Sequence, residues 1–181
     1  MHHHVLDVRD GAAVKTLIDA LGPLDVVVNC AGIIQRNNAE FEIEGFRKTI
    51  EVNLNGSMRM CLAAHSALKA CGGSIVNTSS TSGLVGTGRG APYCSAKGGI
   101  HALTKTAAAQ YGGEKIRVNS IHPGLVDTPR NKNISDEWRQ EMLRGTPLGR
   151  MAEPEEIANA VAFLASDAAS FMTGSALIVD G

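Results

Sequence analysis

Short apolar runs that alternate with helical segments constrain the fold of this chain more than any other feature of its 181 residues. The run Val26-Val27-Val28 is continuous and β-branched, which is typical of a parallel strand covered on both faces. Further strands are expected at 74–78, 116–121 and 176–179, and a shorter one at 5–8. Strands that alternate with helices predict a parallel α/β sheet.

Helices are predicted from apolar stripes with a period near 3.6 residues. Asp10 has the position of an N-cap, and the helix that it begins stops at Gly22-Pro23. A long helical pattern covers 42–70, another follows Pro92, and Pro154 opens the last one. Residues 127–147 are polar and weakly periodic, so we expect a mobile lid there.

Tyr93 and Lys97 lie four residues apart, just after Pro92, which suits a helix entrance. The spacing predicts a phenol and an ammonium on one face of the first turns of a helix. A cation within reach can lower the pKa of a phenol from ~10 by roughly one to three units. The pair therefore indicates proton-transfer chemistry, although two such residues can also be plain surface neighbours.

Ser80 follows the strand at 74–78 and precedes the Tyr93 helix by a short loop. In an open α/β sheet the carboxyl end of a strand is where ligand crevices form. The loop at 83–90 is rich in glycine, but its spacing differs from Gly-x-Gly-x-x-Gly, and no acidic residue follows at the offset that a ribose contact requires. We expect it to form a flexible rim of a substrate pocket rather than a phosphate cradle.

Composition limits the classes of partner. The formal net charge is −1 with both signs interspersed, which predicts no nucleic-acid surface, and no apolar run reaches the ~18 residues of a membrane span. We expect a cytoplasmic protein that acts on small molecules. The four cysteines show no Cys-x-x-Cys spacing, so neither zinc nor a disulfide framework is expected, and the thiols are predicted to be reduced and mostly buried.

The chain resembles the short-chain dehydrogenase/reductase family from Val5 to Gly181. The matching pieces, in family order, are Leu6-Asp7-Val8, Asn29-Cys30-Ala31-Gly32, Val52-Asn53-Leu54, Ser79-Ser80, Tyr93-Cys94-Ser95-Ala96-Lys97, Pro123-Gly124 and Val179-Asp180-Gly181. Cys30 stands where the family usually has a second asparagine. The resemblance implies an alcohol or ketone substrate and a homo-oligomer, a dimer or tetramer, formed through the helices at 42–70 and 91–111.

The resemblance also implies catalytic roles for four residues. Tyr93 is the acid or base, Lys97 assists it and holds a ribose, and Ser80 binds the substrate oxygen. Asn53 orders a water that links the lysine to solvent. From the residue alone, Asn53 on an inward helix face is either a satisfied core asparagine or a residue that holds water.

NAD or NADP is the cofactor that the resemblance implies. Its binding residues would be Asp7, Val8, Asn29, Ala31, Gly32, Tyr93, Lys97, Pro123, Gly124, Val126 and Thr128. The residues also allow plainer interpretations. Asp7 suits a strand-to-helix turn, Asn29 to Gly32 suit a structural strand end, and Pro123-Gly124 suit a turn without any nucleotide.

The family's Thr-Gly-x-x-x-Gly-x-Gly turn, which carries the dinucleotide pyrophosphate, does not occur in this sequence. We therefore expect an N-terminally truncated member: an incomplete Rossmann-like, doubly wound parallel sheet that lacks the first two strands. Residues 5–181 are expected to form a single domain, with residues 1–4 a tag remnant or part of a lost loop. The open edge at Val26 is expected to be covered either by the strand at 5–8 or by a second subunit.

Three functions remain open from the sequence. The first is an NAD(P)-dependent oxidoreductase that uses Tyr93. The second is a truncated, cofactor-deficient relative with an oligomeric, regulatory or vestigial role, because a lost helix N-terminus removes a phosphate site. The third is a binding module whose crevice admits a small molecule without redox chemistry.

Overall fold

Four parallel strands form the centre of the molecule. The computed structural model describes residues 2–36, 38–87, 90–131 and 134–181. The strands are paired in the order β1-β2-β3-β4, and within the register Asn29 lies opposite Asn77 and Thr78 opposite Ile121. This confirms the predicted parallel sheet. The strands are β1 (Val26–Asn29), β2 (Ser74–Thr78), β3 (Arg117–Pro123) and β4 (Ala176–Val179).

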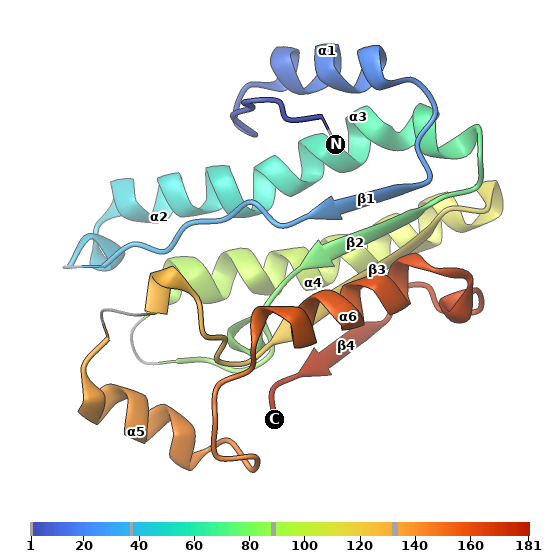
Figure 1. The fold of residues 1–181 in the computed structure, drawn as a ribbon. Coiled ribbons are helices and arrows are strands. Elements are labelled where there is room, and N and C mark those ends of the chain that lie inside the picture. The colour runs from blue at the N-terminus through green and yellow to red at the C-terminus, as the bar shows by residue number, and fades with distance from the viewer. Residues whose placement is uncertain (1, 37, 88–89, 132–133) are drawn as a thin grey trace.

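Helices connect the strands and cover both faces of the sheet (Figure 1). The α-helices are α1 (Gly11–Leu21), α2 (Ile43–Ile50), α3 (Gly56–Lys69), α4 (Ala91–Tyr111), α5 (Asp136–Arg144) and α6 (Pro154–Ala165). One buried cluster joins α1, α3 and α4 to the sheet through residues such as Ile18, Leu68 and Ile75. A second cluster, around Val76, Ile121 and Leu164, joins α6 to the opposite face. The sheet is therefore wound on both sides, as predicted.

Local signals placed the helix starts correctly. Asp10 caps α1, and its carboxylate accepts hydrogen bonds from the backbone N–H groups of Ala12 and Ala13, each at 3.0 Å. At the start of α6, the Glu156 carboxylate accepts the Glu153 N–H at 2.8 Å. Thus α1 follows its predicted cap, and α6 begins at Pro154 as predicted.

The helical pattern at 42–70 is not one regular helix. A π-helical turn, η2 (Glu51–Asn55), lies between α2 and α3 and contains the buried Asn53. Such single turns of π-helix often mark functional sites. A periodicity of apolar residues cannot reveal this turn, because the stripe continues through it.

The expected strand at 5–8 is absent, and the expectation that it pairs with β1 is wrong. Residues 5–8 are irregular and Val5 is fully exposed. The Asp7 carbonyl instead accepts the Asp10 N–H at 3.0 Å, so the chain turns directly into α1. β1 keeps β2 as its neighbour, and Val26 and Val28 are 39% and 44% exposed. Cover of this edge by a second subunit stays a prediction.

One further expectation needs correction. Of the four cysteines, Cys61 is buried, Cys94 is half-buried and Cys30 and Cys71 are exposed, so the thiols are not mostly buried. These exposed thiols stand at the ends of elements, where apolar neighbours are few. The segment at 127–147, expected as a mobile lid, contains α5, which Ser135 caps through its hydroxyl oxygen at 3.2 Å from the Trp138 N–H. Its role as a lid stays a prediction.

Candidate active site at the carboxyl ends of the strands

Tyr93 and Lys97 occupy the first turns of α4, as their spacing predicts. Pro92 stands at the helix entrance, and the Cys94 N–H donates to the Gly90 carbonyl at 2.7 Å to begin the helix. The Lys97 Nζ lies 5.6 Å from the centroid of the Tyr93 ring. Lys97 is only 4% exposed, whereas Tyr93 is half-buried. A buried cation therefore faces a partly accessible phenol.

Two hydrogen bonds fasten Lys97 to the end of β2. Its Nζ donates to the Thr78 carbonyl at 2.5 Å, and its own carbonyl accepts the Ser79 hydroxyl at 2.8 Å. A buried ammonium needs such acceptors because water no longer solvates it. The side chain and the backbone of Lys97 thus both hold α4 against the strand that carries Ser80.

Ser80 stands at the turn that follows β2 and is 9% exposed. Its Oγ accepts the Ser82 N–H at 3.2 Å, and its carbonyl accepts the Gly83 N–H at 2.9 Å. Gly83 touches α4 closely, because a Cβ there would lie 2.6 Å from the Lys97 carbonyl carbon. Gly83 is therefore a packing residue and not part of a flexible rim. Gly88 and Arg89, in the same expected rim, lie outside the described residues.

The chain that leaves β1 brings small residues to the same place. Asn29 is anchored inside the sheet: its Nδ2 donates to the Asn77 Oδ1 at 2.8 Å, and the Asn77 Nδ2 donates to Thr104 at 3.0 Å. Ala31 and Gly32 follow as the chain leaves the sheet. A Cβ on Gly32 would lie 3.9 Å from the Lys97 Nζ, so this loop borders the lysine.

Asn53 holds the next residue of that loop. Its Oδ1 accepts the Ile33 N–H at 2.7 Å, and its Nδ2 donates to the Ile33 carbonyl at 2.9 Å. The side chain is thus a satisfied core asparagine, one of the two alternatives from the sequence. Its main-chain carbonyl accepts the Ser57 hydroxyl at 2.9 Å.

Pro123 and Gly124 end β3 beside the Ser80 turn. The Thr81 hydroxyl lies 3.5 Å from the Pro123 carbonyl, a weak contact that links the two turns. Gly124 donates its N–H to the Val179 carbonyl at 3.0 Å, and a Cβ on it would lie 2.9 Å from the Asp180 Cα. The close approach to β4 therefore explains this glycine without any ligand.

Val126 and Thr128 lie further along the same segment. Val126 forms a parallel bridge with Ala152, and the Thr128 carbonyl accepts the Asn131 N–H at 2.8 Å. The Val126 bridge leads to the segment before α6, whereas the Thr128 bond stays within its own turn. Contacts connect Lys97 with Tyr93, Gly32 and the strand end before Ser80, and Asn53 lies beside Gly32. A place for Val126 and Thr128 in the site stays a prediction.

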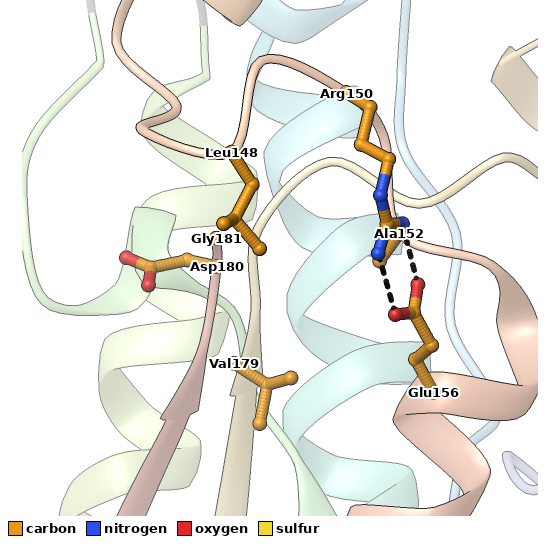
Figure 2. A pocket seen from close by; sticks show the side chains of 7 residues that line it. All are labelled: Leu148, Arg150, Ala152, Glu156, Val179, Asp180 and Gly181. Carbon is orange, nitrogen blue, oxygen red and sulfur yellow. Dashed lines mark hydrogen bonds and ion pairs between the residues drawn. The ribbon is translucent and has the colours of Figure 1, made fainter.

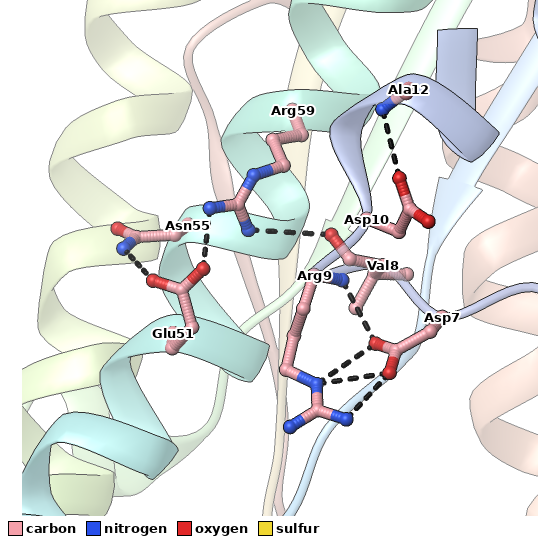
Figure 3. A network of polar contacts seen from close by, with 8 residues as sticks. All are labelled: Asp7, Val8, Arg9, Asp10, Ala12, Glu51, Asn55 and Arg59. Carbon is pink, nitrogen blue, oxygen red and sulfur yellow. Dashed lines mark hydrogen bonds and ion pairs between the residues drawn. The ribbon is translucent and has the colours of Figure 1, made fainter.

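Asp7 and Val8 lie near the start of α3. The Asp7 carboxylate accepts hydrogen bonds from the Arg9 guanidinium, the shortest at 2.6 Å, and these lower the pKa of Asp7 to about 2. Val8 packs on α3: a Cβ on Gly56 would lie 2.7 Å from its Cγ2, and its carbonyl accepts the Arg59 guanidinium at 3.4 Å. Figure 3 shows this network, in which the Asp7 carboxylate turns to Arg9.

His122, to which the sequence analysis gave no role, also belongs to this site. It is fully buried, and its Nδ1 lies 3.1 Å from the Ser80 carbonyl oxygen. Burial lowers its pKa below the ordinary value. A histidine at a strand end, directly before Pro123-Gly124, was the sequence signal that could have indicated it.

Two cavities lie near the margins of this group of residues. The first has a volume of about 70 Å³ (Figure 2). Its rim carries a forked ion pair in which the Arg150 guanidinium donates two hydrogen bonds of 2.7 Å to Glu156, lowering the pKa of Glu156 to about 2. The second, a broad surface hollow of about 600 Å³, is formed by α2, η2 and Arg9. Since neither is lined by Tyr93, Ser80 or Lys97, cavity size does not identify the candidate active site.

Two other kinds of site receive no support within residues 2–36, 38–87, 90–131 and 134–181. No group of three His, Cys, Asp or Glu side chains there is arranged to hold a metal ion. None of the helices in those ranges combines the length and the apolar character needed to cross a lipid bilayer.

Comparison with known proteins gives consistent matches over nearly the whole chain. A family model described as Enoyl-(Acyl carrier protein) reductase matches residues 2–181. The trans-4-hydroxycyclohexanecarboxylate dehydrogenase of Sinomonas cyclohexanicum is 46% identical over 181 residues, covering 97% of this chain and 68% of the relative. The cyclohexanol dehydrogenase of an Acinetobacter species is 44% identical over 173 residues, covering 94% of this chain and 68% of the relative.

A solved structure agrees with these sequence matches. The 3-oxoacyl-[acyl-carrier protein] reductase from Brucella melitensis superposes with a TM-score of 0.91 at 33% sequence identity, covering 98% of this chain and 69% of that one. Fold, family model and relatives lead to one conclusion: the chain belongs to the short-chain dehydrogenase/reductase family of oxidoreductases.

Proposed function

We propose that this protein transfers a hydride between NAD or NADP and an alcohol or carbonyl substrate, with Tyr93 as the acid or base. The observation that carries the proposal is the contact between Lys97 and Tyr93 beside the end of the strand that leads to Ser80. The buried Lys97 ammonium lies beneath the Tyr93 ring and is hydrogen-bonded to the end of the strand that carries Ser80. This supports the proposal because Lys97, Tyr93 and Ser80 all follow the carboxyl end of β2 or lie against it, and ligand crevices form at the carboxyl ends of strands.

The residues at this edge fit the nicotinamide and ribose end of a dinucleotide. Gly32 leaves open a space beside Lys97 that a Cβ would fill. The ammonium can donate to ribose hydroxyls, and the backbone of Ala31 and Gly32 can approach a flat ring closely. When bound, the nicotinamide supplies or accepts the hydride. The residues proposed to contact the dinucleotide are Asp7, Val8, Asn29, Ala31, Gly32, Tyr93, Lys97, Pro123, Gly124, Val126 and Thr128.

Tyr93 would take the hydroxyl proton of an alcohol, or give its own proton to a carbonyl oxygen. The positive charge of Lys97 favours the phenolate form that the first of these steps needs. Asn53 keeps the loop after β1 in place by binding both backbone groups of Ile33. A proton relay to solvent would then use the Asn53 main-chain carbonyl and a water.

Ser80 would orient the substrate oxygen. Its Oγ already accepts the Ser82 N–H, and a hydroxyl has one donor besides its two acceptor sites. Within the described part of the chain, the known contacts of this hydroxyl leave its own hydrogen available. That hydrogen can donate to the substrate oxygen as negative charge develops on it.

The second candidate function is a relative that binds dinucleotide poorly and has an oligomeric, regulatory or vestigial role. The observation in its favour concerns α1. The N–H groups at its N-terminus, which could otherwise bind a phosphate, donate to the Asp10 carboxylate. The negative charge of Asp10 would repel a pyrophosphate there. Dinucleotide affinity therefore separates the two candidates.

The test compares the wild-type protein with two tyrosine variants of α4. Reduced nicotinamide is followed with NAD⁺ or NADP⁺ and with cyclohexanol or trans-4-hydroxycyclohexanecarboxylate, the alcohols named for the two relatives. Tyr93→Phe should lower kcat by about 100-fold or more, because the proton-transfer group is lost. Tyr111→Phe, which makes the same change about five turns along α4, should keep wild-type turnover.

Melting curves should show that both variants remain folded. Full activity of Tyr93→Phe would contradict the assignment of the acid or base. A titration of NADH and NADPH completes the test: micromolar binding supports the oxidoreductase, and no binding at millimolar concentration favours the second candidate.

A further inference from the structure

His122 connects the third strand to Ser80. It stands near the end of β3, is fully buried, and lies on the same face of the strand as Ser120, two residues earlier. Its Nδ1 is 3.1 Å from the Ser80 carbonyl oxygen, and its Nε2 is 2.9 Å from the Ser120 Oγ. Both ring nitrogens therefore have partners inside the protein.

These partners select one tautomer of the ring. A carbonyl oxygen can only accept, so the Nδ1 of His122 must carry a hydrogen and donate it to Ser80. In the neutral ring the Nε2 then accepts the Ser120 hydroxyl. Burial favours the neutral form, and the neighbouring groups on α4, Lys97 and His101, would repel a positive charge.

The contact completes the fixation of Ser80. The serine backbone is extended, with φ −169° and ψ 159°, and its carbonyl already accepts the Gly83 N–H at 2.9 Å. His122 supplies a second donor to the same oxygen, from a different strand. Together with the bond from the Ser82 N–H to Oγ, these contacts set the direction in which the Ser80 hydroxyl points.

We propose that His122 is a positioning residue: its Nδ1–H holds the Ser80 carbonyl and thereby aims the Ser80 hydroxyl at the substrate oxygen. This inference rests on the proposed function, in which Ser80 binds that oxygen. It explains why a fully buried polar ring occupies the strand end where an apolar side chain would fill the space without needing partners.

Two substitutions separate the two ring nitrogens. In His122→Asn the amide nitrogen can take the place of Nδ1 and still donate to Ser80. In His122→Gln the amide reaches the place of Nε2 and Ser120 instead. Both place an amide in the same buried site, so the melting temperature of the two variants should be similar. We expect His122→Gln to lower kcat by about 10- to 100-fold, and His122→Asn by no more than about threefold.

The effect of His122→Gln on kcat is also measured in the Ser80→Ala variant. This comparison separates a positioning role from a merely structural role of His122. Ser80→Ala keeps the carbonyl that His122 binds but has no hydroxyl to aim. If His122 acts through that hydroxyl, adding His122→Gln to Ser80→Ala should lower kcat no further. Equal losses in the Asn and Gln variants, or a full additional loss in the double variant, would overturn the inference.

The outcomes distinguish this inference from the function on which it rests. If the wild-type protein has no turnover, or Tyr93→Phe keeps it, the proposed function fails. If the wild-type protein turns over substrate and Tyr93→Phe does not, but the His122 variants differ from expectation, only the positioning role fails. Should the variants not fold, ¹⁵N NMR of the wild-type His122 ring decides, because a proton on Nδ1 supports the proposal and a neutral ring with its proton on Nε2 refutes it.

Discussion

A buried ammonium is the costliest single group of the candidate active site. Lys97 is 4% exposed, and removal of a charge from water is unfavourable unless acceptors replace the water. The Thr78 carbonyl and the face of the Tyr93 ring provide part of that replacement. The arrangement ties the lysine to one place, which suits a residue that must meet a substrate and a cofactor together.

Leu68 carries a prediction at the residue scale. It is fully buried under the sheet, whereas Leu62 on the same helix, α3, is 57% exposed. Leu68→Ala should lower the free energy of unfolding by about 2–5 kcal/mol, because the surroundings can fill the cavity only in part. Leu62→Ala should change it by less than about 0.5 kcal/mol. Urea denaturation checks both, and equal losses would place the core elsewhere.

The contact between η3 (Thr81–Gly83) and α4 is the element-scale feature on which the site depends. Gly83 lies against the backbone of Lys97, so the two elements touch without a side chain between them. This contact sets the distance between Ser80 and the Tyr93 helix. The π-helical turn between α2 and α3 fixes the position of the loop after β1, because it carries the Asn53 amide that binds Ile33.

Gly83→Ala tests this contact. A Cβ there would lie 2.6 Å from the Lys97 carbonyl carbon, so η3 must move away from α4. We expect the free energy of unfolding to fall by about 1–3 kcal/mol. We also expect kcat to fall, because Ser80 moves with η3. Gly86→Ala is the matched control, since no atom lies within 4 Å of its Cβ position. The same behaviour in both variants would show that η3 and α4 do not need close contact.

At the scale of the whole molecule, β1 is one of the two edge strands of the sheet, the other being β4. An open edge presents unpaired N–H and C=O groups, to which another chain can add. Val26 and Val28 are partly exposed beside it, and α6 packs on the same face nearer β2. An apolar surface at an open edge favours association, which agrees with the predicted homo-oligomer.

Val28→Lys tests whether a second subunit covers this edge. If it does, a lysine there should shift the protein toward the monomer, because a charge would be buried in the interface. Light scattering after size-exclusion chromatography measures the mass. Thr16→Lys adds the same charge on the exposed side of α1 and should leave the mass unchanged. A monomeric wild-type protein, or an unaltered oligomer in Val28→Lys, would contradict cover by a second copy.

The sequence by itself determined the four strands of the parallel sheet and the Tyr93-Lys97 face of α4, because periodicity and helix caps are local properties. Tertiary structure decided the rest. It left residues 5–8 without a strand, since a strand forms only with a neighbour, and it placed His122 on the carbonyl of Ser80. Those two residues lie 42 positions apart. Contacts of that kind depend on how strands and helices pack, which no local pattern of residues encodes.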